Sequence, residues 1–215
     1  MSKTRIRFWL AKWKWTWRRV RKSLKKNRDE GLFRFFEQEI KELIKLEVAG
    51  EIDLFSYDES GFNLNPSSVY AWHKPGSTIS LPAERGKTLT VAGFFSRANQ
   101  LEAYTLDGAM NADWFIAFVD DFAQKCARKT VVLLDQAPFH KSAKVRAKIK
   151  EWQDKGLFLQ FIPAYSPELN WIENLWRMIK HQWLPVSAYS TYKLLTSTLN
   201  DILLNVGSKY STSFG

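Results

Sequence analysis

The sequence predicts an α/β protein built on one mixed β-sheet, with an antiparallel hairpin half, flanking helices and a basic helical arm in front. Two β-rich segments, residues 88–95 and 101–106, are joined by a short polar stretch, which is typical of a hairpin. In the second half of the chain, strand-like runs alternate with helical patterns, as in α/β folds. The continuous apolar run at residues 131–134 predicts a central strand buried on both faces.

The first 28 residues form the basic arm. They hold twelve Lys and Arg and no acid, so the net charge of +10 is local, because the remaining residues carry 20 bases against 22 acids. Trp9, Trp13, Trp15 and Trp17 alternate with these bases. Such a block suits the neutralisation of nucleic-acid phosphates with indoles stacking or wedging nearby. A helix on an anionic membrane surface and a plain solvated tail are the alternatives.

A second basic segment, residues 141–150, follows the buried strand, and its bases either track phosphates or form a solvated face. The bases selected as DNA-binding candidates are Arg5, Arg7, Lys12, Lys14, Arg18, Arg19, Arg21, Lys22, Lys25, Lys26, Lys141 and Lys144.

The first half of the chain yields one helix and four strands. An amphipathic helix is expected at residues 29–48, because apolar side chains recur there at near-helical spacing. The first strand should end at Asp58, before the polar turn Glu59-Ser60-Gly61. The strands expected in this half are residues 52–58, 69–72, 88–95 and 101–106.

The second half yields alternating helices and strands, each supported by its apolar period. A helical period begins at Asn111, and the last expected helix ends at Gly207. The strands expected here are residues 131–134 and 157–162, and the later helices are residues 142–154, 166–183 and 190–206.

Composition and spacing argue against several other classes of protein. No stretch approaches the roughly 18 apolar residues of a membrane span. The single cysteine, Cys126, permits no internal disulfide and favours a reducing, intracellular location. His73 and His181 have no zinc-ligand spacing with each other or with that cysteine. A phosphate-binding loop at residues 81–88 fails because Leu81 stands where its first glycine belongs.

Three acids fall where an α/β fold exposes functional groups. Asp58 ends the first strand, Asp135 ends the buried strand, and Glu173 lies in a late helix. Because side chains alternate along a strand, Asp58 and Glu59 should point to opposite faces, so only one of them can face the site. Hard carboxylate oxygens select Mg²⁺ or Mn²⁺, and two such ions can stabilise the attacking and leaving oxygens of a phosphoryl displacement.

Two of the three acids also have a simpler explanation. Asp135 follows four apolar residues, where an unpaired carboxylate is costly without a cation or donors, but it could equally cap a turn or helix. Glu173 has Arg177 at i+4 and Lys180 at i+7, which fits an exposed row of ion pairs. From the pattern alone, a structural role remains open for both acids.

Three segments around these acids resemble the signature blocks of mariner-related bacterial insertion-sequence transposases, in the same order and spacing. The blocks are YDESGF at residues 57–62, LLDQAPFHKS at residues 133–142 and PAYSPELNWIENLW at residues 163–176, and YAWHKPG at residues 70–76 resembles a segment between the first two. The resemblance implies a ribonuclease H-like fold and a catalytic, metal-binding DDE triad of Asp58, Asp135 and Glu173. It also implies a supporting role for His140, although a structural or capping histidine is the alternative.

The chain departs from that family in several places. Gln136 stands where an Asn is usual, Trp171 stands where a Pro is usual, and the 37 residues between Asp135 and Glu173 slightly exceed the mariner-type interval. The family's helix-turn-helix modules are represented at most by the end of one, in residues 5–26. We therefore expect residues 1–50 to be a basic, Trp-rich arm and linker helix left from a DNA-binding region. Residues 51–190 should form the catalytic domain, and residues 191–215 a C-terminal helix and tail.

The sequence therefore predicts the catalytic domain of a DNA transposase, which cuts and joins phosphodiesters at transposon ends with Mg²⁺ or Mn²⁺. Its expected partner is double-stranded DNA, at the transposon ends and the target, bound by a homodimer, with no membrane association. The expected location is the bacterial cytoplasm, at the nucleoid. A ribonuclease H-like nuclease outside transposition is the enzymatic alternative. A truncated, catalytically silent DNA-binding regulator of an intact transposase is the non-enzymatic one.

Overall fold

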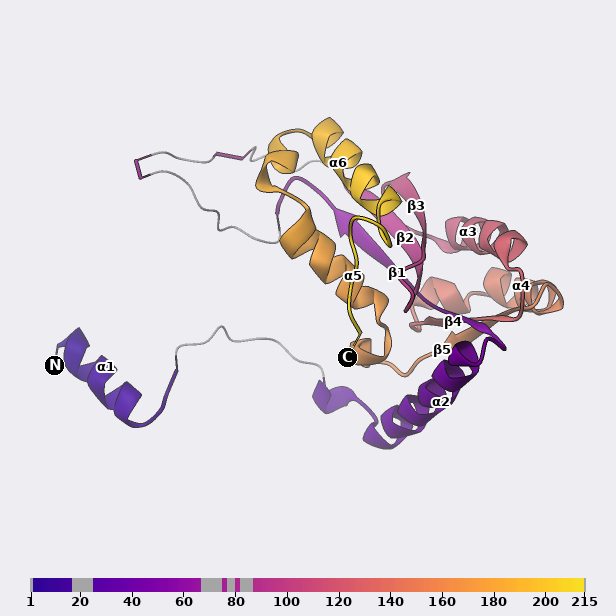
Figure 1. The fold of residues 1–215 in the computed structure, drawn as a ribbon, viewed down its shortest axis with the longest axis horizontal. Helices are drawn as coiled ribbons and strands as arrows, with labels where there is room; N and C mark the ends of the chain where they lie inside the picture. Colours follow the sequence, from indigo (N-terminus) through magenta and orange to yellow (C-terminus); the bar gives the residue numbers. More distant parts are fainter. Residues whose placement is uncertain (1, 17–24, 67–74, 77–79, 82–86, 215) are drawn as a thin grey trace.

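A five-stranded mixed sheet forms the centre of the computed structural model, which describes residues 2–16, 25–66, 75–76, 80–81 and 87–214 (Figure 1). The strand order is β3-β2-β1-β4-β5, in which β1 pairs antiparallel with β2 and parallel with β4. The strands are β1 (Asp53–Phe62), β2 (Leu89–Ser96), β3 (Leu101–Asp107), β4 (Thr130–Leu134) and β5 (Leu157–Phe161). The predicted mixed sheet with an antiparallel hairpin half, flanked by helices, is confirmed.

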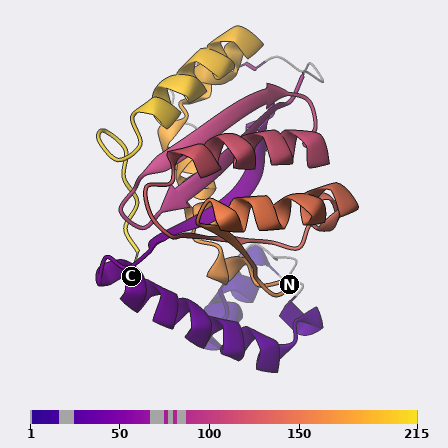
Figure 2. The same cartoon turned by 90° about the vertical axis from the view of Figure 1, so that its right-hand side faces the viewer.

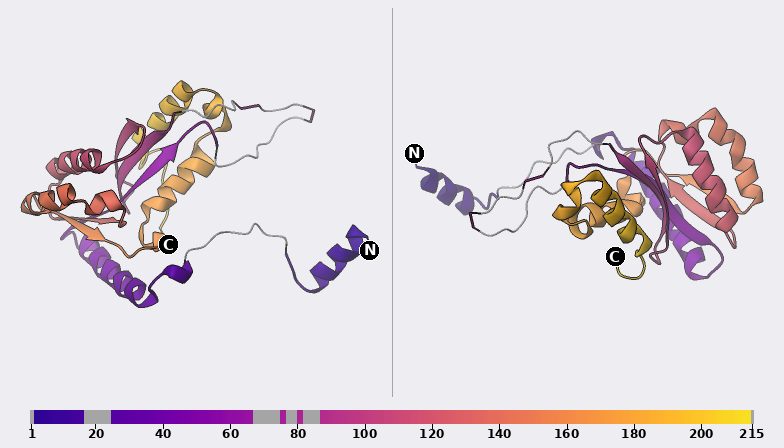
Figure 3. Two further views of the ribbon diagram at one scale, coloured as in Figure 1. Left: turned by 180° about the vertical axis from the view of Figure 1, so that it is seen from behind. Right: turned by 90° about the horizontal axis from the view of Figure 1, so that it is seen from above.

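Helices cover both faces of the sheet (Figure 3). On one face, α3 (Ala112–Lys125) and α4 (Ala143–Asp154) pack against a core that includes Tyr57, Phe94 and Trp152. On the other face, α5 (Ile172–Met178) and α6 (Tyr192–Leu204) share a core with Val91 and Phe95. The C-terminal helix therefore packs into the same hydrophobic cluster as the helix that carries Glu173.

The helix α2 (Glu30–Val48) lies below the sheet in Figure 2. It contributes Ile40 to a third cluster, which contains Leu54, Val131 and Ile162. Its N-cap is Asp29, whose side chain accepts a hydrogen bond from the backbone N–H of Leu32 at 2.9 Å. The helix expected at residues 29–48 is thus confirmed.

The first strand is longer than predicted. Glu59, Ser60 and Gly61 do not form a turn but continue β1, since they pair with Ala92, Val91 and Thr90 of β2. Their low strand propensity is overridden by this pairing, which extends to Phe62 opposite Leu89. The polar residues Glu59-Ser60-Gly61 therefore did not mark the end of the strand, because β2 supplies hydrogen-bond partners for their backbone.

The single helix predicted at residues 166–183 is also wrong. The segment is a 3₁₀ turn (η3, Pro167–Leu169), then α5, then a π-helical turn (η4, Ile179–Trp183). Asn170 interrupts the first part because its backbone is extended and its side chain is held by β1. The result is a short helix with Glu173 in its first turn.

The arm contains one described helix, α1 (Lys3–Lys12), and a 3₁₀ turn (η1, Lys25–Asn27). The strand predicted at residues 69–72 lies outside the described residues, as do the DNA-binding candidates Arg18, Arg19, Arg21 and Lys22. None of the described helices has the length and apolar character that a bilayer crossing requires.

Candidate active site

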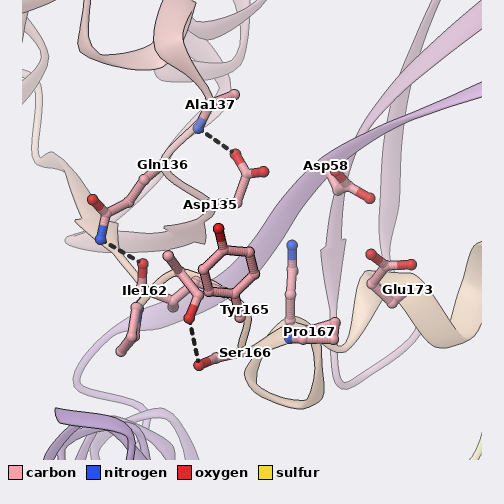
Figure 4. Close-up of a pocket in the computed structure, with 12 residues that line it drawn as sticks. Asp58, Asp135, Gln136, Ala137, Ile162, Tyr165, Ser166, Pro167 and Glu173 are labelled. Atoms are coloured by element: carbon pink, nitrogen blue, oxygen red, sulfur yellow. Dashed lines mark hydrogen bonds between the residues drawn. The ribbon is translucent and has the colours of Figure 1, made fainter. Parts of the chain in front are cut away.

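One cavity of about 360 Å³ brings the three predicted acids together (Figure 4). Asp58 comes from β1, Asp135 follows β4, and Glu173 comes from α5. The remaining wall consists of the segment after β5, from Ile162 to Asn170, and the Gln136-Ala137 pair. β1 and β4 are parallel neighbours whose pairing ends at Ser56 and Leu133, so Asp58 and Asp135, each two residues further on, lie side by side.

Asp58 is the most enclosed of the three. It points to the face covered by α5, where the indole Nε1 of Trp176 donates a hydrogen bond to Asp58 Oδ2 at 3.1 Å. Burial, followed by repulsion from the carboxylates of Glu173 and Glu59, raises the pKa of Asp58 to about 8. An ionised carboxylate at this position is therefore costly without a cation beside it.

Asp135 is held by two donors and remains open to the cavity. Its Oδ1 accepts a hydrogen bond from the backbone N–H of Ala137 at 2.9 Å and lies 2.9 Å from His140 Nδ1. The bond to His140, aided by the Ala137 N–H, lowers the pKa of Asp135 despite partial burial. The turn-capping role considered for this residue is thus present, and it orients a carboxylate that also lines the cavity.

Glu173 lies in the first turn of α5 with an exposed side chain. Burial raises the pKa of its carboxyl group, the nearby Lys180 lowers it, and Asp135 raises it further. Arg177, one of the two bases considered as ion-pair partners, donates instead to Asn174 Oδ1 at 2.5 Å. Lys180 lies on the π-helical turn η4 with its ammonium 5.0 Å from the ring centre of Phe62.

Asn170 and Trp171 tie this wall of the cavity to the sheet. The buried Asn170 side chain bonds Ser56 Oγ and donates to the Tyr57 carbonyl at 3.1 Å. The Trp171 indole donates to the Phe95 carbonyl at 2.8 Å. Sequence reasoning missed both roles. The available signal was an amide and an indole beside a Pro-rich turn in the block that carries Glu173.

His140 is buried in the turn η2 (Pro138–Lys141) and joins two acids. Its Nδ1 faces Asp135 and its Nε2 lies 3.1 Å from Glu59 Oε1. Burial opposes the charged ring, but the hydrogen bonds to Asp135 and Glu59 raise the pKa of His140 to about 9. Glu59 itself was set aside at the sequence level because it points away from the face of Asp58.

The DNA-binding candidates divide by position. Arg5, Arg7, Lys12, Lys14 and Lys26 are exposed, and Lys25 begins η1. In contrast, Lys144 pairs with Asp113 at 2.7 Å, and Lys141 donates to Gln136 Oε1 at 3.2 Å. Among the described candidates, Lys141 is connected to the cavity through its partner Gln136, which lines it.

The donor set of the cavity suits a hard divalent cation. Three carboxylates line it, and burial together with repulsion between the acids raises the pKa of Asp58, while Lys180 is the nearby base that partly offsets their charge. As the side chains stand, no three His, Cys, Asp or Glu groups of the described chain form a ready ligand cluster for a single ion.

A ribonuclease H-like α/β sheet with two acids from neighbouring strands and a third from a packed helix, gathered in one cavity, is typical of the DDE nucleases. The chain belongs to this class, since residues 53–196 match the family of DDE superfamily endonucleases. That match covers all five strands of the sheet, all three acids and the first part of α6.

Solved structures share the fold at low sequence identity. The chain is similar to the Mos1 transposase in its paired-end complex with the left transposon end, with a TM-score of 0.63 and 16% identity over 95% of this chain. It is also similar to the catalytic domain of Mos1 mariner transposase, with a TM-score of 0.54 and 16% identity over 88% of this chain and 85% of that one. The chain spans 63% of the transposase in the paired-end complex.

Among curated proteins, an uncharacterized protein of Sinorhizobium fredii (strain NBRC 101917 / NGR234), y4pE/y4sA, is 34% identical over 74 residues. The matched segment covers 34% of this chain and 47% of that protein.

Proposed function

We propose that this chain is the catalytic part of a DNA transposase that breaks and joins phosphodiesters with two divalent cations, Mg²⁺ or Mn²⁺. The observation that carries the proposal is the convergence of Asp58, Asp135 and Glu173 on one cavity at the edge of the sheet. Structures of Mos1 mariner paired-end complexes with Mn and with Mg share this fold, at TM-scores of 0.61 and 0.55, and support the same cations here.

In this proposal the three carboxylates are the ligands of the cations. Asp58 and Asp135 would hold the cations and Glu173 would complete the second site, because all three carboxylates line the same cavity. Bound cations would neutralise the charge that develops on the attacking and leaving oxygens of an in-line displacement. The hydrogen bonds from Trp176, Ala137 and His140 orient the carboxylates before substrate arrives.

The substrate of the proposal is double-stranded DNA. Water attacks a phosphodiester at the transposon end, which leaves a 3′-hydroxyl and a 5′-phosphate. The 3′-hydroxyl then attacks a target phosphodiester, so one bond forms as another breaks. The basic arm supplies phosphate contacts, and assembly as a homodimer on DNA is part of the proposal. The proposed assembly on DNA is supported by the fold shared with the Mos1 transposase in a paired-end complex. The proposed location is the bacterial cytoplasm, at the nucleoid.

The test is a nicking assay on supercoiled plasmid, together with strand transfer from a duplex that ends in a recessed 3′-hydroxyl, each with Mn²⁺ or EDTA. We expect Mn²⁺-dependent products from the wild type, and a loss of at least 100-fold for Asp135→Asn and Glu173→Gln. The matched controls are Asp154→Asn at the exposed end of α4 and Glu42→Gln on α2, whose side chain is 62% exposed, and both should keep wild-type rates.

Nicking without strand transfer would support a nuclease outside transposition instead. DNA binding without either product would support a silent regulator. Activity that is indifferent to Asp135→Asn would contradict the proposal.

A further inference from the structure

Two consecutive residues of β1 face opposite sides of the sheet, and both lie close to the candidate active site. Asp58 lines the cavity directly. Glu59 points to the face covered by α3 and α4, where its side chain is 15% exposed. A carboxylate with so little exposure needs a partner, because desolvation of an unpaired charge is costly.

The partner of Glu59 is His140. Its Nε2 lies 3.1 Å from Glu59 Oε1, and its Nδ1 lies 2.9 Å from Asp135 Oδ1. The ring is 1% exposed and is enclosed by Phe115 and Phe139, with ring centres 4.5 and 4.3 Å away. One carboxylate therefore sits at each nitrogen of a ring that its neighbours prevent from turning.

Asp135 has few other restraints. Its side chain is 54% exposed, and the Ala137 N–H bonds the same oxygen, Oδ1, that faces His140. Both of these contacts act on Oδ1, and the ring of His140 supplies one of them. Loss of Glu59 would leave the buried ring with a single polar partner, and the angle at which it holds Asp135 would no longer be fixed from both ends.

We propose that Glu59 is a positioning residue, which orients Asp135 for cation binding through the ring of His140. The inference rests on the proposed function, because it presumes that Asp135 is a ligand. β1 then sets two acids of the site, Asp58 directly and Asp135 through the Glu59 and His140 side chains. Groups that orient metal ligands in this way typically contribute 10–100-fold to metal affinity.

The test measures cation affinity without catalysis. Tb³⁺ is a hard trivalent probe for oxygen ligands, and its luminescence is sensitised by nearby indoles such as Trp176, which contacts Asp58. Titration of the full chain with Tb³⁺, and competition by Mn²⁺, gives the affinity of each variant. We expect Glu59→Ala to weaken Mn²⁺ binding by about 10-fold or more, and Glu59→Gln, which retains an acceptor, to weaken it less.

Glu102→Gln is the matched control, since Glu102 lies on the same sheet and pairs with Lys125 at 2.6 Å, away from the cavity. It should bind Mn²⁺ as the wild type does. Thermal unfolding of each variant in EDTA verifies that it is folded. If Glu59→Ala does not fold, Glu59→Gln carries the test, because it preserves shape and packing.

A double-variant cycle separates positioning from a general structural effect. If His140 transmits the effect of Glu59, adding Glu59→Ala to His140→Asn should weaken binding no further. Additive losses would overturn the proposal, as would wild-type affinity in both Glu59 variants. Asp135→Asn distinguishes this failure from that of the proposed function. Unchanged Tb³⁺ binding in Asp135→Asn would refute the cation site itself, whereas lost binding there with intact Glu59 variants would refute only the positioning role.

Discussion

The indole Nε1 of Trp176 donates a hydrogen bond to Oδ2 of Asp58 at 3.1 Å, so a core side chain of α5 also orients a carboxylate of the site. Trp176 is only 3% exposed and belongs to the cluster that joins α5 and α6 to the sheet. Packing of α5 and orientation of Asp58 are therefore one structural feature, and a change in either one should alter the other.

Trp176→Phe should slow catalysis more than it disturbs folding. Phe keeps most of the apolar contact but removes the donor, and a hydrogen bond to a charged group contributes about 1.5–3 kcal/mol. We expect the single-turnover nicking rate at saturating Mn²⁺ to fall about 10-fold. Trp183→Phe, at the edge of the same cluster, is the control and should stay near the wild-type rate. Equal losses in the two variants would argue that only packing matters.

Asp58→Asn should stabilise the metal-free protein at neutral pH. The pKa of Asp58 is raised to about 8 in the folded chain from an ordinary 3.8, so its contribution to stability is present at low pH and is lost as pH rises between these values. Removing the charge should raise the free energy of unfolding at pH 8 by about 2–4 kcal/mol. The melting temperature in EDTA should then rise by roughly 5–10 °C.

Repeating the melting experiment with Mn²⁺ in place of EDTA tests whether a cation compensates this charge. Mn²⁺ should raise the melting temperature of the wild type, because it compensates the buried charge, but should leave Asp58→Asn nearly unchanged. Asp154→Asn, at the exposed end of α4, controls for a general charge effect. A variant at position 58 that melts below the wild type in EDTA at pH 8 would contradict the assigned pKa.

Gly93→Ala should lower both stability and activity, because a side chain at this position of β2 would displace α5. Gly93 is the cross-strand partner of Asp58 on β2, and a Cβ there would lie 3.1 Å from Ile172 Cδ1 and 3.1 Å from Trp176 Cη2. Overpacking of this kind costs about 1–3 kcal/mol, and it would push α5 with its Glu173 away from Asp58. We expect a lower melting temperature and reduced nicking.

Gly61→Ala provides the comparison for Gly93, since a Cβ at Gly61 meets only the side-chain methyl of Thr88, at 3.2 Å. That contact lies at an exposed position of β1, where the methyl group can move. Retained stability and activity in Gly93→Ala would show that the spacing between α5 and β2 is not limiting.

The sequence predicted the sheet well because its signals were strong and local. The apolar run before Asp135 became a fully buried strand, and the alternation in β1 placed Asp58 and Glu59 on opposite faces. The continuation of β1 through Gly61 was not predictable from local propensity, since it depends on pairing with β2. The length of β1 is thus set by its partner strand and not by its own residue pattern.

The same limit applies to the site. The three acids were found from strand ends and family blocks, and they line one cavity. Glu59 and Asn170 were missed because their roles arise from contacts across 81 and 113 residues of sequence, to His140 and to the Tyr57 carbonyl. No periodicity in a single sequence encodes such contacts.

The basic arm should carry more of the DNA affinity than the basic helix α4. The exposed Arg5 and Arg7 lie on α1, in a segment without acids, whereas Lys144 is paired with Asp113 and Lys141 is engaged by Gln136. Each base that neutralises a phosphate contributes about 0.9 to the slope of log affinity against log salt concentration. The double variant Arg5→Gln/Arg7→Gln should therefore lower that slope by about 2, and Lys141→Gln/Lys144→Gln by less than about 1. Fluorescence anisotropy of a labelled duplex between low and moderate salt measures both slopes. A larger loss from the Lys141/Lys144 pair would place the main phosphate contacts beside the three acids rather than on the arm, because Lys141 is the last residue of the turn that holds His140 against Asp135.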